Sequence, residues 1–291
     1  MSCGLRSEGT GDHNNSTSQI MYSPRIISFF DILGFRNFVL NHKLQDVIKC
    51  FQIVFNSICS ASARLTTRMI LDPLAFKDRE QFLVKLKEKS ANGDGRSSPR
   101  SVLEYFENET GWEALLLSDS LLLYSEEISE KPPLKALTNA ILISRIITMK
   151  FFEQYLPVRG AISFGEFYAN REDSIYFGKA LVEAYELTES QQWIGTAIAP
   201  SAEEYASVLA KDFQISTLSD LCSVRPGWDL IRWEIPLKTG FKEGWVVNWA
   251  SAWNAGGPVP DDFFDSRLTG DPQVDQKYAN TLRFLQEWRE K

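Results

Sequence analysis

Residues 25–35, which read RIISFFDILGF, constrain the fold most strongly. Their first residues have the composition of a buried strand, and the run ends abruptly at a carboxylate, Asp31. Gly34 then allows the backbone to turn. Apolar residues follow at helical spacing, at Phe35, Phe38, Val39, Leu44, Val47, Ile48, Phe51, Val54, Phe55 and Ile58. The segment therefore predicts a strand, an acid, a turn and a helix, an arrangement that suits a metal ion holding polyphosphate.

The chain divides into a tail, one large domain and a C-terminal extension. Residues 1–22 are rich in Gly, Ser, Asn and Thr, which favours a disordered tail. Residues 23–250 form the predicted domain, and its first helix is expected to run from about residue 35 to about residue 64. The charged, Gly- and Ser-containing residues 66–111 read as an insertion after that helix. Residues 251–291 are expected to form a loop and a terminal helix, packed on the domain or on a partner subunit.

The remaining pattern alternates short apolar runs with helical stretches. Residues 112–124 hold two apolar runs around a Ser-Asp-Ser break, which predicts a β-hairpin with Asp119 at its tip. A strand from residue 157 is expected to turn at Gly165 into a second hairpin. Long helices are expected over residues 134–155, 179–190, 200–209 and 273–290, and further strands over residues 193–199, 231–237 and 245–249.

This order predicts an α+β fold with a ferredoxin-like βαββαβ core, in which helices cover a mostly antiparallel sheet. The end of the first strand and the tip of the central hairpin lie side by side in such a core. Asp31 and Asp119 are therefore expected to converge, although they are far apart in the sequence.

Two Asp residues on neighbouring strands supply hard oxygen ligands for one or two Mg²⁺ or Mn²⁺ ions. The alternative uses are structural, with Asp31 as the cap of the first helix and Asp119 as an ordinary turn residue. We favour the metal site because each acid ends an intensely apolar strand and the two strands are predicted to be adjacent.

Composition excludes several other classes. The chain has 291 residues, 44% of them hydrophobic, which supports a sizeable core. Only His13 and His42 are present and the four cysteines form no C-x-x-C pair, which argues against a zinc site or a Ser-His-Asp triad. The net charge of −7 argues against binding of long nucleic acid. With neither a long apolar run nor a secretory signal, we expect a cytoplasmic protein without a membrane segment.

Four ordered segments resemble the class III nucleotidyl (adenylate/guanylate) cyclases. Residues 30–35 resemble the family's F-x-D-I-x-G-F signature, and residues 117–120 resemble its second acidic hairpin, usually I-G-D. Residues 159–166 resemble the R-x-G-I-H-x-G-E strand, and residues 177–189 resemble the F-G-x-x-V-N-x-A-x-R-L-E segment. Together these segments cover about 160 residues of the chain in the order that the family has.

The resemblance implies an activity and its metal ligands. Class III cyclases join the ribose 3′-hydroxyl to the α-phosphate of a nucleoside triphosphate and release pyrophosphate. Two Mg²⁺ or Mn²⁺ ions are implied, with Asp31, the backbone carbonyl of Ile32 and Asp119 as ligands.

The resemblance also implies residues for the terminal phosphates. The backbone amides of Leu33, Gly34 and Phe35 would hold them at the start of the first helix. Lys238 matches the family's late triphosphate-binding lysine, and its alternative role is that of a solvated lysine at a strand end.

The departures from the family pattern concern the sugar, the transition state and the base. Val182 stands where the family has the Asn that orients ribose, and Glu186 stands where it has the Arg that stabilises the transition state. A Glu cannot neutralise developing phosphate charge, so another cation must do so or turnover is lost. Leu115 and Ile175 occupy the purine-reading positions, and their apolar side chains cannot form the hydrogen bonds that read a purine edge.

The cation that replaces the missing Arg is left open by the sequence. Arg36, Arg159 and Lys179 are the candidates, and Arg159 is more readily explained as a structural anchor.

This combination most resembles the bacterial pyrimidine (uridylate/cytidylate) cyclases of anti-phage Pycsar signalling. That resemblance implies UTP, in preference to CTP, as substrate, a homodimer with its site at the subunit interface, and a separate effector activated by the cyclic product. One alternative is a catalytically inactive cyclase-fold module that binds a nucleotide or a partner. Another is an enzyme that makes an oligonucleotide on the same core, although the G-G-D-E-F signature of diguanylate cyclases is absent.

Overall fold

The computed structural model describes residues 22–55, 112–128, 134–212, 230–250, 264 and 271–288. The elements are β1 (Ser23–Ile32), α1 (Phe35–Asn41), β2 (Trp112–Leu117), β3 (Ser120–Ser125), α5 (Leu134–Glu153), β4 (Val158–Asn170), β5 (Ile175–Phe177), α6 (Lys179–Ser190), β6 (Gly195–Ile198), α7 (Pro200–Asp212), β7 (Leu230–Leu237), β8 (Gly240–Val247) and α11 (Pro272–Trp288). Residues 44–55 are also helical. The predicted tail 1–21 and insertion 66–111 lie outside the described residues.

The strands form one sheet in the order β2-β3-β1-β4-β6-β8-β7, and β5 pairs with the far end of β4. The pairing of β4 with β6 is parallel, whereas β1 is antiparallel to both of its neighbours, β3 and β4. The first four strands thus have the ferredoxin-like order, and the predicted α+β fold with a mostly antiparallel sheet is confirmed.

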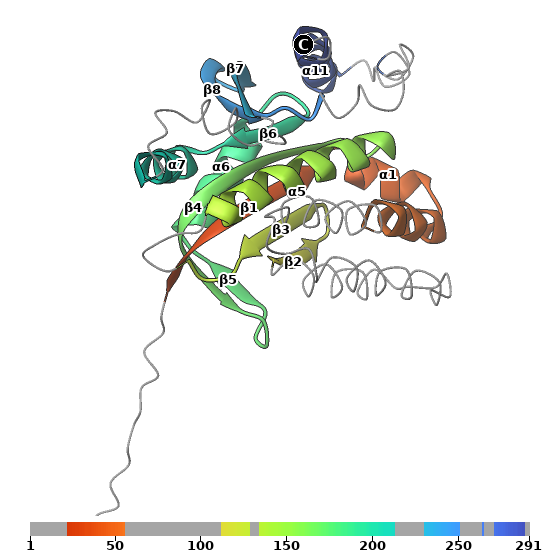
Figure 1. Cartoon of the computed structure of the whole chain (residues 1–291). Helices are drawn as coiled ribbons and strands as arrows, with labels where there is room; N and C mark the ends of the chain where they lie inside the picture. Colours follow the sequence, from red (N-terminus) through yellow and green to blue (C-terminus); the bar gives the residue numbers. More distant parts are fainter. Residues whose placement is uncertain are drawn as a thin grey trace, which may run out of the picture.

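Alternation along β1 divides the core into two faces. Ile26, Phe30 and Ile32 pack with α5, α7 and residues 44–55 on one face. Ile27 and Phe29 pack on the opposite face with Ala180 and Ala184 of α6. Figure 1 shows α5 crossing the sheet, with β7, β8 and α11 together at one end. Asp31 follows the alternation of Phe29 and therefore belongs to the α6 face.

The first helix differs from the prediction because it breaks at His42. The His42 backbone is extended, with φ −122° and ψ 154°. Its ring Nδ1 donates a hydrogen bond to the carbonyl of Phe38 at 2.8 Å, so the side chain satisfies an acceptor that the helix end leaves open. A second helical segment begins at residue 44. The predicted extension of this helix over residues 56–64 lies outside the described residues.

The predicted turn at Gly165 is wrong, because β4 continues through this residue to Asn170. Gly165 has a φ of 153°, a conformation that residues with a side chain rarely adopt, so glycine is favoured at this position inside the strand. The chain turns over residues 171–174, where the side-chain oxygen of Asn170 accepts a hydrogen bond from the amide of Asp173 at 3.0 Å.

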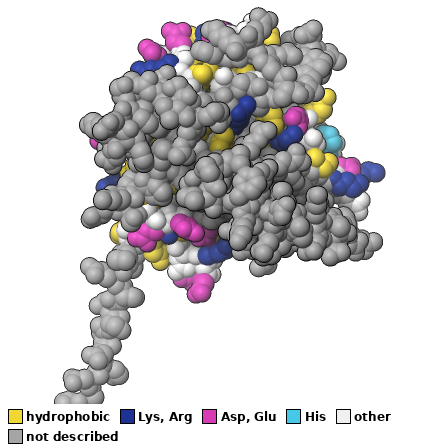
Figure 2. Space-filling view, in the orientation of Figure 1, with side chains coloured by type: hydrophobic (Ala, Val, Ile, Leu, Met, Phe, Trp, Pro, Cys, Tyr) yellow, Lys and Arg dark blue, Asp and Glu magenta, His cyan; other side chains and the backbone are white. Residues whose placement is uncertain are grey.

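The terminal helix α11 packs on its own domain rather than standing free. Phe284 and Leu285 join Trp193, Trp233 and Trp249 in a buried cluster under β6, β7 and β8. Within the described residues, none of the helices has the length and apolar character required to cross a membrane. Among the described residues of the face in Figure 2, acidic and basic side chains are interspersed.

Candidate active site

The end of β1 and the tip of the β2–β3 hairpin lie side by side, as the sequence predicts. Asp31 is the register partner of Ser120, and the amide of Ile32 donates to the carbonyl of Asp119 at 2.8 Å. The hairpin turns on two residues, Ser118 and Asp119, and Ser118 has a positive φ of 55°. This tight turn holds Asp119 against the strand that carries Asp31.

Asp31 has one oxygen engaged and one available. Its Oδ2 accepts a hydrogen bond from Nε of Arg159 at 2.8 Å, and its side chain is 17% exposed. Its Oδ1 has no hydrogen-bond or ion-pair partner among the described residues. The N-cap of α1 is Gly34, without a side-chain hydrogen bond, so Asp31 does not cap the helix. The capping alternative is therefore excluded.

The electrostatics at Asp31 favour a bound cation. Burial raises the pKa of Asp31, the charge and hydrogen bond of Arg159 oppose that rise, and the charges of Glu189 and Asp119 add to it. A cation between the two Asp side chains would offset their repulsion and favour the ionised form of Asp31.

Arg159 is hydrogen-bonded to several groups near the end of β1, including Asp31. Its Nη1 donates to the carbonyls of Glu189 at 3.0 Å and Gln191 at 3.2 Å, and its Nη2 pairs with the carboxylate of Glu189. The Arg159 side chain is only 8% exposed. Next to it, Gly160 allows β4 to approach β1, because a Cβ there would lie 2.5 Å from the ring of Phe30. Arg159 therefore ties Asp31 to the end of α6, and its guanidinium is fully engaged.

Two lysines lie beside this network. Lys238 follows β7, and its amide donates to the carbonyl of Ser190 at 2.7 Å. Its ammonium lies 3.6 Å from the carboxylate of Glu189 and is 55% exposed. Lys277, on α11, interacts electrostatically with Arg159, Asp31, Lys238 and Glu189. The structure thus brings Lys238 near Asp31, through Glu189 and Arg159.

Asp119 is exposed, and its carboxylate has no hydrogen-bond or ion-pair partner among the described residues. The turn is held through the Asp119 backbone carbonyl rather than through its side chain. An exposed carboxylate without a partner fits an ordinary turn residue and also a metal ligand, so the turn alternative stays open.

The residues present fit a magnesium or manganese site completed by a substrate. No group of three or more His, Cys, Asp or Glu side chains suited to a metal occurs in the described part of the chain. Mg²⁺ does not require one, because it is usually held by one or two carboxylates, substrate phosphates and waters. Asp31 Oδ1 and the Asp119 carboxylate meet that requirement. The carbonyl of Ile32 stays a predicted third ligand.

The predicted amides for the terminal phosphates differ in availability. The amide of Leu33 donates to the carbonyl of Pro157 at 2.8 Å, so in this structure it is not available for a phosphate. The amides of Gly34 and Phe35 stay candidates. The helix at whose start they lie has only seven residues, which limits the field that its dipole supplies.

The two predicted base-pocket residues lie on β2 and β5. Leu115 lies on β2 and packs against the cluster of the α6 face. Ile175 pairs with Asn170 at the far end of β4, whereas Arg159, the register partner of Asp31, lies at its near end. The 13-residue β4 separates these ends by more than about 30 Å. Ile175 is therefore not brought to Asp31 within one chain.

Val182 and Glu186 lie one turn apart on the exposed face of α6. Neither lies where Arg159 meets Asp31. Of the cations considered as substitutes for the missing Arg, Lys179 pairs with Glu166 at 2.9 Å, and Arg159 is consumed by its own network. Arg36 is exposed.

Sequence reasoning missed Glu189 and Lys277. Glu189 lay within the segment matched to the cyclases, and its position in the last turn of an amphipathic helix was the available signal. Lys277 is one lysine in a terminal helix, and no local pattern marked it.

The protein has an α+β fold, in which two carboxylates and a cluster of cationic side chains lie near the end of the central strand β1. No family model and no curated protein matches the sequence. The structure is similar to the crystal structure of a class III adenylyl cyclase-like ATP-binding protein from Pseudomonas aeruginosa, with a TM-score of 0.39 and 12% identity, covering 63% of this chain and 34% of that chain. This chain thus spans about a third of that protein.

A second similar structure is that of the adenylyl cyclase CyaB from P. aeruginosa. It has a TM-score of 0.42 and 10% identity, covering 78% of this chain and 94% of that chain. Both similarities are too low for the activity of either protein to be transferred to this chain. The proposed function therefore rests on the residues around Asp31 and Asp119.

Proposed function

We propose that this protein is a nucleotide cyclase that converts a pyrimidine nucleoside triphosphate, UTP in preference to CTP, to its 3′,5′-cyclic monophosphate and pyrophosphate. The observation that carries the proposal is the convergence of Asp31 and Asp119, each with carboxylate oxygen available. Lys238 joins the same network through Glu189 and Arg159. The order of the four cyclase-like segments in the sequence supports it.

The chemistry is one displacement at phosphorus. The 3′-hydroxyl oxygen forms a bond to the α-phosphorus, the bond from that phosphorus to the bridging oxygen breaks, and pyrophosphate leaves with the electron pair while the hydroxyl proton passes to solvent. Two Mg²⁺ or Mn²⁺ ions, when bound, would lower the pKa of the hydroxyl and stabilise charge on the leaving group.

The side chains of this chain have distinct roles in that proposal. Asp31 and Asp119 bind the metal, and Arg159 is a positioning residue that fixes the Asp31 carboxylate through its Oδ2. Lys238 binds the triphosphate. Apolar side chains at Leu115 and Ile175 favour a pyrimidine over a purine, because they leave a purine edge without hydrogen bonds.

We propose a homodimer, because Ile175 reaches the acids only if a second copy supplies it. Exposed apolar side chains on α6 and β5 support such a pairing: Ile175 and Phe177 are each 45% exposed, Tyr185 is 51% and Val182 is 55%. The cyclic product would act on a separate effector in anti-phage defence.

The test is incubation of the full-length protein with UTP, CTP, ATP or GTP and Mn²⁺. We expect pyrophosphate and a cyclic monophosphate from UTP, less from CTP, and none after chelation of the metal. Product mass separates a cyclic mononucleotide from an oligonucleotide. Absence of product from all four triphosphates would refute the cyclase proposal.

The second candidate is an inactive cyclase-fold module that binds a nucleotide without turnover. Val182 and Glu186 favour it, because the sugar- and transition-state-binding pair of the cyclases is absent from α6. Nucleotide binding in calorimetry, together with no pyrophosphate release in the incubations, would establish this candidate in place of the first.

A further inference from the structure

The C-terminal helix α11 is fixed against the loop that follows α6. The side-chain amide of Asn280 donates to the carbonyl of Gln192 at 2.7 Å, and the hydroxyl of Thr281 accepts from the amide of Ile194 at 2.9 Å. Both contacts are buried or partly buried. This loop begins at Gln191, whose carbonyl holds Arg159, so α11 lies directly beside the network of Asp31.

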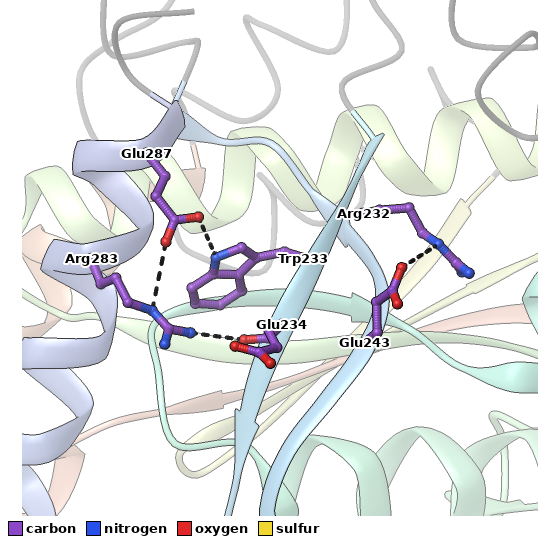
Figure 3. A pocket seen from close by; sticks show the side chains of 6 residues that line it. All are labelled: Arg232, Trp233, Glu234, Glu243, Arg283 and Glu287. Carbon is purple, nitrogen blue, oxygen red and sulfur yellow. Dashed lines mark hydrogen bonds and ion pairs between the residues drawn. The ribbon is translucent and has the colours of Figure 1, made fainter.

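A second set of contacts fixes the other end of α11 (Figure 3). The guanidinium of Arg283 lies 5.0 Å from the ring centre of Trp233, and its Nη2 donates to the carbonyl of Glu234 at 2.9 Å. Glu287 accepts from the indole nitrogen of Trp233 at 3.0 Å. Glu234 contributes its backbone carbonyl to this pocket, and Arg283 also lies over the ring of Phe241, so these contacts hold α11 on β7 and β8.

These contacts set the position of Lys277. It lies one helical turn before Thr281, whose hydroxyl donates to the Lys277 carbonyl at 2.7 Å, so both residues lie on one face of α11. The Lys277 side chain is partly buried, and its ammonium has no hydrogen-bond or ion-pair partner among the described residues.

The charges around Lys277 are those of the candidate active site. Burial lowers the pKa of Lys277, the positive charges of Arg159 and Lys238 lower it further, and the negative charges of Asp31 and Glu189 oppose this effect. A partly buried ammonium without a paired carboxylate is costly. Arg159 and Lys238 are already paired with Asp31 and Glu189, so among these three cations it is Lys277 whose charge an added anion would offset.

We propose that Lys277 of α11 binds the polyphosphate of the substrate together with Lys238, so that the C-terminal helix completes the active site. This inference rests on the proposed function, because it assigns a further phosphate-binding residue to the same active site. A triphosphate carries enough negative charge to contact both lysines and metal ions at Asp31 and Asp119. In the cyclases an Arg stands at the position that Glu186 occupies on α6. Lys277 would supply a positive charge to the substrate from α11 of the same chain.

The test measures binding of inorganic tripolyphosphate with excess Mn²⁺ by calorimetry, using the full-length protein. This probe has no base and no ribose, so it does not depend on which nucleotide is the substrate or on turnover. Lys277→Gln is expected to weaken binding about tenfold or more, the value of one charge-assisted contact. Lys277→Arg, which keeps the charge, is expected to restore most of the affinity.

Lys242→Gln is the matched control, because Lys242 is an exposed lysine on β8. Its affinity is expected to stay within twofold of wild type, and the unfolding midpoints of all variants are expected to agree. An unchanged affinity in Lys277→Gln, or an equal loss in Lys242→Gln, would overturn the inference, as would absence of binding to the wild type. Binding that depends on Lys277 in a protein without turnover would support the inference and refute the cyclase proposal.

Discussion

Asp119→Asn is expected to reduce cyclic nucleotide formation by about a thousandfold or more, because it removes a metal-binding carboxylate while keeping the shape of the side chain. Asp119 is exposed, and its carboxylate has no partner among the described residues. The free energy of unfolding is therefore expected to change by less than about 0.5 kcal/mol. Rates of pyrophosphate release and urea denaturation measure the two effects.

Asp46→Asn provides the control for loss of an exposed carboxylate. Asp46 lies on the helical segment of residues 44–55 and forms a surface pair with Lys49 at 3.9 Å. The Asp46→Asn variant is expected to turn over substrate at the rate of the wild type. If Asp119→Asn also kept near-normal turnover in an active preparation, Asp119 would not be a metal ligand.

Arg159→Met is expected to lower the free energy of unfolding by about 3–5 kcal/mol. The substitution keeps much of the apolar length but removes the hydrogen bonds to two carbonyls and to the carboxylates of Asp31 and Glu189. Asp31 would then be a largely buried carboxylate without its cation. Urea denaturation followed by tryptophan fluorescence gives the change in unfolding free energy.

Lys179→Met separates this effect from loss of an ordinary ion pair. Lys179 pairs with Glu166 at 2.9 Å, but their side chains are 85% and 59% exposed. Its removal is expected to cost less than about 1 kcal/mol. Equal changes in the two variants would show that the Arg159 network contributes no more than a surface pair.

Local patterns predicted the elements that position the acids. The apolar run before Asp31, the Ser-Asp-Ser break of the hairpin and the period of α6 each express a strong preference over a short stretch, and the structure has β1, β2–β3 and α6 at those places. The prediction that Asp31 and Asp119 are neighbours followed from strand order, which the ferredoxin-like pattern determines.

Two other features were not predictable in the same way. The apolar period continues across residue 42, but the backbone becomes extended at His42, whose ring donates to the Phe38 carbonyl one turn earlier. Gly165 has the signature of a turn, whereas its backbone, with a φ of 153°, continues β4. In both cases a pattern over many residues did not determine the backbone conformation at a single residue.

Parts of the candidate site depend on contacts between segments that are distant in the sequence, and these were not predicted. The partnership of Asp31 with Arg159 joins β1 to β4, and the position of Lys277 depends on how a terminal helix packs against a loop that precedes β6. Neither has a sequence spacing of its own. The availability of the Leu33 amide was also unpredictable, because the Pro157 carbonyl that occupies it lies on a distant segment.

The most direct test of the central claim is a crystal structure of the full-length protein with Mn²⁺ and 3′-deoxy-UTP, which lacks the attacking hydroxyl. We expect anomalous scattering from metal within about 2.2 Å of carboxylate oxygens of both Asp31 and Asp119, with the triphosphate beside Lys238 and Lys277. Metal and nucleotide bound elsewhere, with both carboxylates uncoordinated, would contradict the account.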